Sequence, residues 1–314
     1  SLYRPNTKRG NPRIWFTNIR EYVAPESLMA LFIRDDKLYI LNCSNSRLYQ
    51  NFLTNSHLLA LVTDQTNQLS PAANELLNKM KAISSNGFIK TMRAGDTGVG
   101  FTLESLLGIQ ANSSKTPDFK GIEIKSTRKR NKKGTLLSMV PDWTNSNIKD
   151  GNELVLKRGH INSSKGNLKT IFHSIDAVKP NSYNLQLKLD DSWIHQIYKL
   201  NNISEKDVRW SIQELAERLA AKHKETFWVD TETRLSNAGE EEFLYKAVIH
   251  TSKIDIHSIP ELIEQGSINI DYLLWEKRKD WKTYVNKSGF DFLWKIKMKD
   301  RDLLFKSVNK FPLS

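Results

Sequence analysis

The sequence predicts an α/β protein in which helices flank a mixed sheet, preceded by a small α+β unit. The first supporting observation is size, because 314 residues with 39% hydrophobic content are enough for one large domain or two modest ones. The second is pattern, because segments that alternate apolar and polar residues are interspersed with segments of helical spacing. Strands that alternate with helices along a chain favour an α/β sheet.

The first 85 residues are predicted to form the separate α+β unit. Residues 28–32 and 38–41 flank a charged turn and are expected to pair as a β-hairpin. Ser70 and Pro71 are typical of a helix start, and the apolar spacing that follows ends near Gly87. We expect the boundary there, so the domains are 1–85 and 86–314. The first is either a binding or effector module or an additional scaffold.

The elements of the second domain follow in chain order. Thr102 is expected to cap a short helix with apolar residues on one side. A strand is predicted at residues 122–126. The other predicted elements are a strand at 184–189, a helix with the core stripe Trp210, Leu215 and Leu219, strands at 226–229 and 243–249, a short helix at 259–263, strands at 268–274 and 290–298, and a last helix carrying Leu303, Leu304 and Phe305.

Residues 117–125 carry groups suited to metal-dependent phosphodiester hydrolysis. The predicted strand sends two isoleucines to the core and Glu123 and Lys125 to the opposite face. The preceding turn can bring Asp118 beside Glu123, and two close carboxylates repel unless a hard cation such as Mg²⁺ lies between them. With Lys125 alongside, such an ion supplies an activated water and neutralises charge on the phosphate oxygens.

Two interpretations of this spacing are open at this point. An exposed Glu and Lys at alternate positions of a half-solvated strand explain it without catalysis. A catalytic site explains it too, and the upstream residues favour that interpretation. A glycine-rich turn at 95–100 leads into a helix that carries Glu104, a third carboxylate, although a lone helix glutamate is more often solvated.

These residues together resemble the active-site block of the MvaI/BcnI-type restriction endonucleases. That family is a branch of the PD-(D/E)xK nucleases and is similar to the mismatch-repair nicking enzyme MutH. The similarity covers about residues 86–314, and it implies a PD-(D/E)xK restriction-endonuclease-like core. The matching positions are Gly95, Thr97, Gly98, Gly100, Glu104, Pro117, Asp118, Phe119, Ile122, Glu123, Ile124 and Lys125.

The resemblance also implies a role for each site residue. Asp118 and Glu123 would bind Mg²⁺ together with the main-chain carbonyl of Ile124. Lys125 would orient the attacking water or stabilise the charge of the phosphorane. Glu104 would be the outer carboxylate, reaching the metal directly or through water.

Two basic segments are the predicted backbone contacts to double-stranded DNA, with a merely solvated charged face as the alternative. The first leaves the motif strand directly after Lys125, on the side where a phosphate would approach. The second is punctuated by glycines and is expected to be a mobile loop or ribbon over the duplex. The predicted contacts are Arg128, Lys129, Arg130, Lys132 and Lys133 in the first segment, and Lys157 and Arg158 in the second.

The resemblance implies that base recognition lies late in the chain, where the match weakens. Asn269, Lys277 and Arg278 are predicted to donate to guanine or adenine edges in the major groove. Trp275 and Trp294 are equally suited to packing. The target sequence therefore does not carry over from the family.

Composition agrees with a polyanion partner. The formal net charge is +12 and the sequence pI is about 9.5. No apolar run approaches the roughly 20 residues that cross a bilayer, and the first residues lack a signal-like pattern, so we expect a cytoplasmic protein without a membrane partner. The one cysteine, Cys43, excludes an intrachain disulfide and a multi-cysteine zinc site.

We therefore predict a Mg²⁺-dependent DNA endonuclease, a type II restriction enzyme that acts as a monomer and nicks each strand of a short duplex site in turn. A single active site per chain supports that stoichiometry. One alternative is a MutH-like repair or phage-derived nicking nuclease that needs a partner. The other is a DNA-binding protein of the same fold that no longer cuts.

Overall fold

A computed structural model describes residues 2–4, 13–34, 37–54, 69–95, 97–109, 117–128, 132–276 and 289–313 of the chain. The chain divides into two compact units, Ser1–Gln68 and Leu69–Ser314, and each is described by itself.

The first unit contains two antiparallel strand pairs and a helix. β1 (Leu2–Arg4) pairs with β2 (Arg13–Trp15), β3 (Met29–Arg34) pairs with β4 (Lys37–Asn42), and α1 (Ser46–Thr54) follows. The β3–β4 pair confirms the predicted hairpin. Phe32 and Tyr39 stack across it with ring centroids 5.2 Å apart, a cross-strand contact that fixes its register. A binding, effector or scaffold role for this unit stays a prediction.

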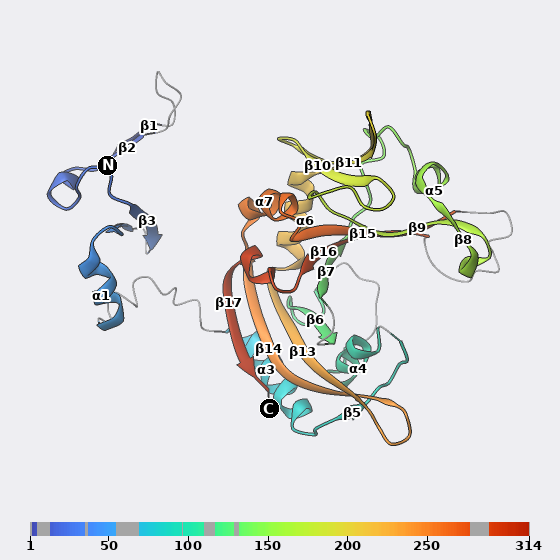
Figure 1. Cartoon of the computed structure of the whole chain (residues 1–314). Helices are drawn as coiled ribbons and strands as arrows, with labels where there is room; N and C mark the ends of the chain where they lie inside the picture. Colours follow the sequence, from blue (N-terminus) through green and yellow to red (C-terminus); the bar gives the residue numbers. More distant parts are fainter. Residues whose placement is uncertain are drawn as a thin grey trace. The chain divides into compact units, whose positions relative to one another are not determined.

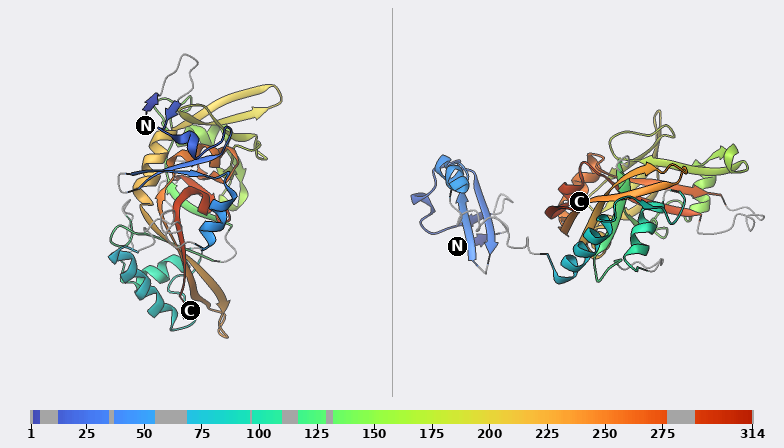
Figure 2. Two further views of the ribbon diagram at one scale, coloured as in Figure 1. Left: turned by 90° about the vertical axis from the view of Figure 1, so that its left-hand side faces the viewer. Right: turned by 90° about the horizontal axis from the view of Figure 1, so that it is seen from below.

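One sheet of the second unit contains the motif strand. β6 (Glu123–Arg128) pairs in parallel with β13 (Glu225–Leu235), and the sheet continues with β14 (Glu241–Ile254) and β17 (Phe305–Pro312). The short β5 (Ile89–Lys90) pairs with the start of β14. The β13–β14 hairpin extends past the end of β6, as the left view of Figure 2 shows.

A second sheet has the strand order β7-β16-β15-β9-β8. Tyr272, Phe292 and Trp294 are fully buried on one of its faces, so the tryptophan is a packing residue. Because β6 and β7 are consecutive in the chain, the two sheets adjoin where the motif strand ends (Figure 1). The strands are β7 (Lys133–Ser138), β16 (Phe290–Lys297), β15 (Ile268–Trp275), β9 (Leu168–Ile175) and β8 (His160–Asn162).

Helices and a third, three-stranded sheet complete the unit. Leu215 and Leu219 anchor α6 in the same core as the second sheet. The elements are α4 (Gly98–Leu106), α5 (Gly151–Arg158), α6 (Ile212–Lys222), α7 (Ile259–Glu264), β10 (Leu185–Leu189), β11 (Trp193–Leu200) and β12 (Ile203–Ser211). The mixed sheet around β6 and the flanking helices confirm the predicted fold class. No helix in the described part of the chain is long and apolar enough to span a membrane.

The boundary between the units differs from the predicted one at residue 85. α3 (Pro71–Ser84) begins as predicted, because the Ser70 hydroxyl oxygen accepts a hydrogen bond from the Ala73 N–H at 3.0 Å. Leu76 and Met80 on its apolar side are fully buried in a core shared with β13 and β14. The helix therefore belongs to the second unit.

Three other predicted elements also differ. α4 begins at Gly98, so Thr102 lies inside the helix and its hydroxyl accepts a hydrogen bond from the Met92 N–H (3.0 Å). Trp210 belongs to β12, and its indole N–H donates to the Met139 carbonyl. The last predicted helix is a 3-10 turn, Arg301–Leu304, followed by β17. Of the two forms predicted for the segment at 157–169, a mobile loop or a ribbon, the structure has the ribbon: the end of α5 leads into β8, which pairs antiparallel with β9 across a 3-10 turn.

Candidate active site

A tight turn places Asp118 beside the motif strand. Phe119 and Ile122 pair through both of their main-chain hydrogen bonds, at 2.9 and 2.8 Å. Between them Lys120 (φ 46°) and Gly121 (φ 90°) occupy left-handed conformations, which glycine adopts without strain. The Asp118 carboxylate then accepts a hydrogen bond from the Ile124 N–H at 2.8 Å. Asp118 and the strand are therefore held in fixed register.

Glu123 is not on a solvated face, because its side chain is only 1% exposed. Its Oε1 is in contact with two ammonium groups, those of Lys125 and Lys222, the second at 3.2 Å. Its Oε2 is buried and finds no hydrogen-bond partner among the described residues. A buried carboxylate oxygen without a partner is costly, so the arrangement fits a cation at this oxygen.

The three acidic side chains of the site influence one another. Burial first, and then the charge of Asp118, raises the pKa of Glu104. Burial, and then the charge of Glu123, raises the pKa of Asp118. A Cβ added at Gly100 would lie 3.6 Å from Glu104 Oε1 and 3.5 Å from Ser126 Oγ, so the Glu104 side chain extends over the α4 glycine toward β6. The fold thus brings Glu104 of α4 close to Asp118 and Glu123 of the following turn and strand.

The donor set fits a hard divalent cation. Carboxylate oxygens are the ligands that Mg²⁺ and similar ions prefer, and a bound cation would relieve the repulsion between Asp118 and Glu123. Within the described ranges, no group of three or more His, Cys, Asp and Glu side chains is arranged as a complete metal site. The main-chain carbonyl of Ile124 as a ligand stays a prediction.

Arg128, predicted as a DNA contact, is buried and has a structural partner. Its guanidinium donates to both carboxylate oxygens of Glu241 at 2.8 Å and to the Gly95 carbonyl at 3.0 Å. Its side chain is 3% exposed. The residue ties the end of β6 to β14 and to the glycine-rich turn before α4, which positions the helix of Glu104.

The other predicted basic contacts have mixed outcomes. Arg158 donates to Asp207 twice at 2.8 Å and also contacts Glu205. Lys157 pairs with the same Glu205 at 3.0 Å, and Lys132 is exposed. The paired residues on α5 are thus already engaged inside the protein. Lys129, Arg130, Lys277 and Arg278 lie outside the described residues.

Asn269 and Lys133 belong to a polar cluster on the second sheet, opposite its apolar core. The Lys133 ammonium donates to Ser174 Oγ (2.7 Å), Asn269 Oδ1 (2.8 Å) and Asp271 Oδ1 (3.0 Å). Lys295 contacts the other oxygen of Asp271 at 2.9 Å. Burial opposes ionisation of Asp271, but the Ser174 hydroxyl and the two lysines hold its pKa below the ordinary value. We call these five residues the β15 polar cluster.

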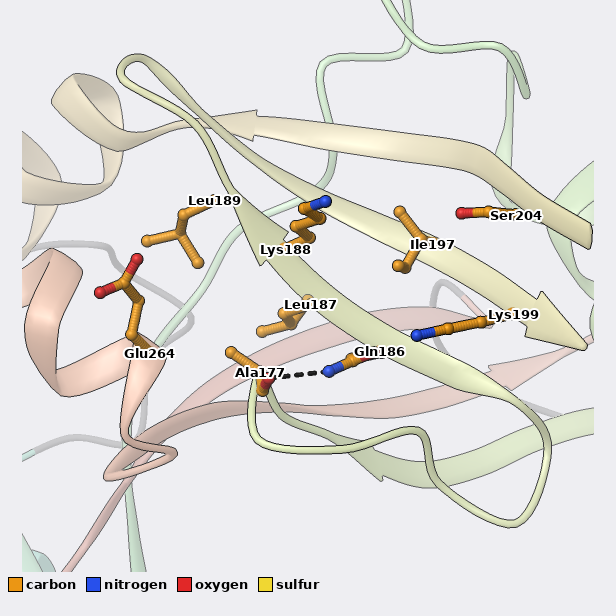
Figure 3. Close-up of a pocket in the computed structure, with 9 residues that line it drawn as sticks. All are labelled: Ala177, Gln186, Leu187, Lys188, Leu189, Ile197, Lys199, Ser204 and Glu264. Carbon is orange, nitrogen blue, oxygen red and sulfur yellow. Dashed lines mark hydrogen bonds between the residues drawn. The ribbon is translucent and has the colours of Figure 1, made fainter. Parts of the chain in front are cut away.

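A pocket of about 460 Å³ lies elsewhere, beside β10, β11 and α7 (Figure 3). Lys188, Lys199 and Glu264 are among its lining residues, and the Gln186 amide donates to the Ala177 carbonyl at 2.8 Å. None of the predicted catalytic or metal-binding residues lines it. The concave shape alone therefore does not locate the active site.

Lys222 is the site residue that the sequence did not reveal. It lies 97 positions after Lys125 in the sequence and is the last residue of α6. A basic residue in the last turn of a helix is common, because it complements the helix dipole, so its position carried no separate signal. Only the packing of α6 places its ammonium on Glu123.

The fold is consistent with the core of the PD-(D/E)xK nucleases, and Asp118, Glu123 and Lys125 stand at the positions of their motif. The model of the MvaI/BcnI restriction endonuclease family matches residues 77–305, and the chain belongs to that family. It is therefore a type II site-specific endodeoxyribonuclease. The match begins inside α3, in agreement with the assignment of this helix to the second unit.

The same fold is found in a solved structure. A complex of restriction endonuclease MvaI with its cognate DNA substrate is 23% identical, with a TM-score of 0.64, and the match covers 79% of this chain and all of that one. MvaI in the absence of DNA is 21% identical with a TM-score of 0.43, covering 77% and 98% of the two chains. No curated protein sequence matches the chain.

Proposed function

We propose that the chain hydrolyses double-stranded DNA at a short specific site with Mg²⁺, acting as a monomer that nicks one strand at each binding event. The observation that carries the proposal is Glu123, whose buried Oε2 has no partner in the described structure while Asp118 lies next to the same strand. Family membership supports the reaction, and one motif per chain supports the stoichiometry.

In this proposal Asp118 and Glu123 hold the metal. A bound Mg²⁺ would activate a water molecule and neutralise charge on the phosphate. Lys125 lies on the same strand with its ammonium at Glu123, so it can orient the attacking water or stabilise the charge on the phosphate oxygens. Glu104 takes the outer position, where its raised pKa reflects burial and the neighbouring carboxylates.

The β15 polar cluster supports a role in DNA contact. Its lysines and carboxylate offer both donors and acceptors on one sheet face, which suits the major-groove edges of base pairs. Asn269 is only 2% exposed and its oxygen is taken by Lys133, so we assign it to holding Lys133 in place. Lys132, which is exposed just before β7, is the residue of the first basic segment that we assign to a phosphate contact.

The test is incubation of the purified protein with supercoiled plasmid, with and without Mg²⁺, followed by sequencing of the ends. We expect Mg²⁺-dependent cleavage in which nicked circles form before linear DNA, with fixed end sequences. Asp118→Ala and Lys125→Ala should abolish cleavage but retain duplex binding, because the basic surface supplies most of the affinity.

Retained cutting in either variant would overturn the site assignment. Wild-type activity only after addition of a partner protein would favour the MutH-like alternative. Duplex binding without cleavage under any divalent ion would favour the silent DNA binder. Linear DNA formed without a nicked intermediate would refute the sequential nicking mechanism.

A further inference from the structure

Lys222 is a second lysine at the metal-binding carboxylate, supplied by a different element from Lys125. Its ammonium lies 3.2 Å from Glu123 Oε1, the oxygen that Lys125 also contacts. Its side chain is 22% exposed, so one side of it still faces solvent. Its charge also acts on Asp118, which places it within electrostatic reach of both predicted metal ligands.

The protein holds the backbone of Lys222 rigidly. The Ser211 hydroxyl accepts a hydrogen bond from the Glu214 N–H at the start of α6, and Leu215 and Leu219 are fully buried. At the other end, the next residue, His223, is completely buried and contacts Thr226 Oγ1 and the Leu136 carbonyl, each at 3.0 Å. The core thus fixes the backbone from which the Lys222 side chain reaches Glu123.

Two ammonium groups contact one oxygen of Glu123, and both of them also act on the nearby carboxylate of Asp118. Lys125 alone would balance Glu123, and an additional cation close to the ligands lowers the affinity of the site for a divalent ion. That cost is offset if the second ammonium has another anionic partner when the metal is bound. The phosphate of the DNA backbone is the anion that this reaction brings to the site.

We infer that Lys222 is an internal counter-ion of Glu123: it neutralises this carboxylate while no metal is bound, and it contacts the DNA phosphate once a divalent ion at Oε2 supplies the balancing charge. The inference rests on the proposed function, since it needs both a metal and a phosphate at this site. It makes Lys222 a residue that couples metal binding to substrate binding. Removal of its charge should therefore raise the affinity for the metal and lower the rate of DNA cleavage.

The experiment compares wild type with Lys222→Met by two measurements. Mg²⁺ titrated calorimetrically into the DNA-free protein should bind roughly tenfold more tightly to the variant, because a competing cation is gone. Plasmid cleavage at saturating Mg²⁺ should be slower by roughly tenfold to a hundredfold, because one phosphate contact is lost. A merely structural role would weaken metal binding and cleavage together.

Matched variants separate the outcomes. Lys222→Arg keeps the charge and should restore metal affinity to the wild-type value, and Lys224→Met, which removes an exposed lysine two residues away, should change neither measurement. If Lys222→Met fails to fold, Lys222→Gln is measured in its place. Mg²⁺ affinity that is unchanged or lower in the variant, with an active wild type, refutes the inference alone. A wild type that neither binds Mg²⁺ nor cuts DNA refutes the proposed function as well.

Discussion

His223 should make the stability of the second unit depend on pH in a predictable way. The imidazole is 0% exposed and lies between Thr226 Oγ1 and the Leu136 carbonyl. Because a carbonyl only accepts, Nε2 carries the proton and Nδ1 accepts from the hydroxyl, which is the neutral form of the ring. Burial, assisted by the charges of Lys125 and Lys222, lowers the pKa of His223 from 6.5 to about 3.

The sign and size of the effect follow from this depressed pKa. The unfolded chain takes up a proton near pH 6.5, whereas the folded protein does not until about pH 3. The stabilisation is therefore complete above the unfolded value and is lost as pH falls from 6.5 toward 3. Between pH 8 and pH 5.5 the loss is about 1.4 kcal/mol, and any folded pKa below about 4.5 gives nearly the same figure.

The assay is urea unfolding at pH 8 and pH 5.5, followed by tryptophan fluorescence. His223→Gln keeps a donor for the Leu136 carbonyl but cannot titrate, so its loss of stability on acidification should be smaller than that of wild type by about 1.4 kcal/mol. His257→Gln, which removes an exposed histidine, should follow wild type. An equal pH dependence in wild type and His223→Gln would refute the assignment of a buried neutral imidazole.

Two further predictions concern the framework of the site. Arg128→Met should lower the free energy of unfolding by about 2–4 kcal/mol, because it breaks a buried ion pair. Lys132→Met should change this free energy by less than about 0.5 kcal/mol. If urea unfolding gave the two variants similar free energies, the structural role of Arg128 would be contradicted. A chain of residues 69–314 should melt cooperatively when followed by circular dichroism. Residues 86–314 should not, because loss of α3 removes Leu76 and exposes the core that it covers. Cooperative melting of the shorter chain would support the boundary at residue 85.

The sequence was most informative where the chemistry is local. Asp118, Glu123 and Lys125 lie within eight positions, and a turn followed by a strand is enough to bring them together. The burial of Glu123 was not predictable from alternation, because α6 covers the face that the pattern assigned to solvent. Lys222 was missed for the same reason, since its place depends on how a distant helix packs.

Charged residues near the motif were the least predictable. A basic run looks the same in a sequence whether it faces solvent or pairs inside the protein. Arg128 and Arg158 pair with carboxylates more than 45 positions away, on β14 and β12, and no local sequence pattern indicates such pairs. The helix predicted from Trp210 onward is present as α6, but it begins two residues later than predicted. The apolar stripe continues from the end of β12 into α6, and both segments bury their residues in one core.

The internal pairing of Arg128, Lys133, Lys157 and Arg158 bears on how the enzyme would search DNA. Each phosphate contact releases counterions and steepens the loss of affinity with salt, and contacts of this kind supply almost all non-specific binding. Lysines and arginines that already pair with Glu241, Asp271, Glu205 and Asp207 are less available for such phosphate contacts. The 47 lysines and arginines therefore include side chains that are not available for phosphate contacts, and the protein should leave non-target DNA quickly.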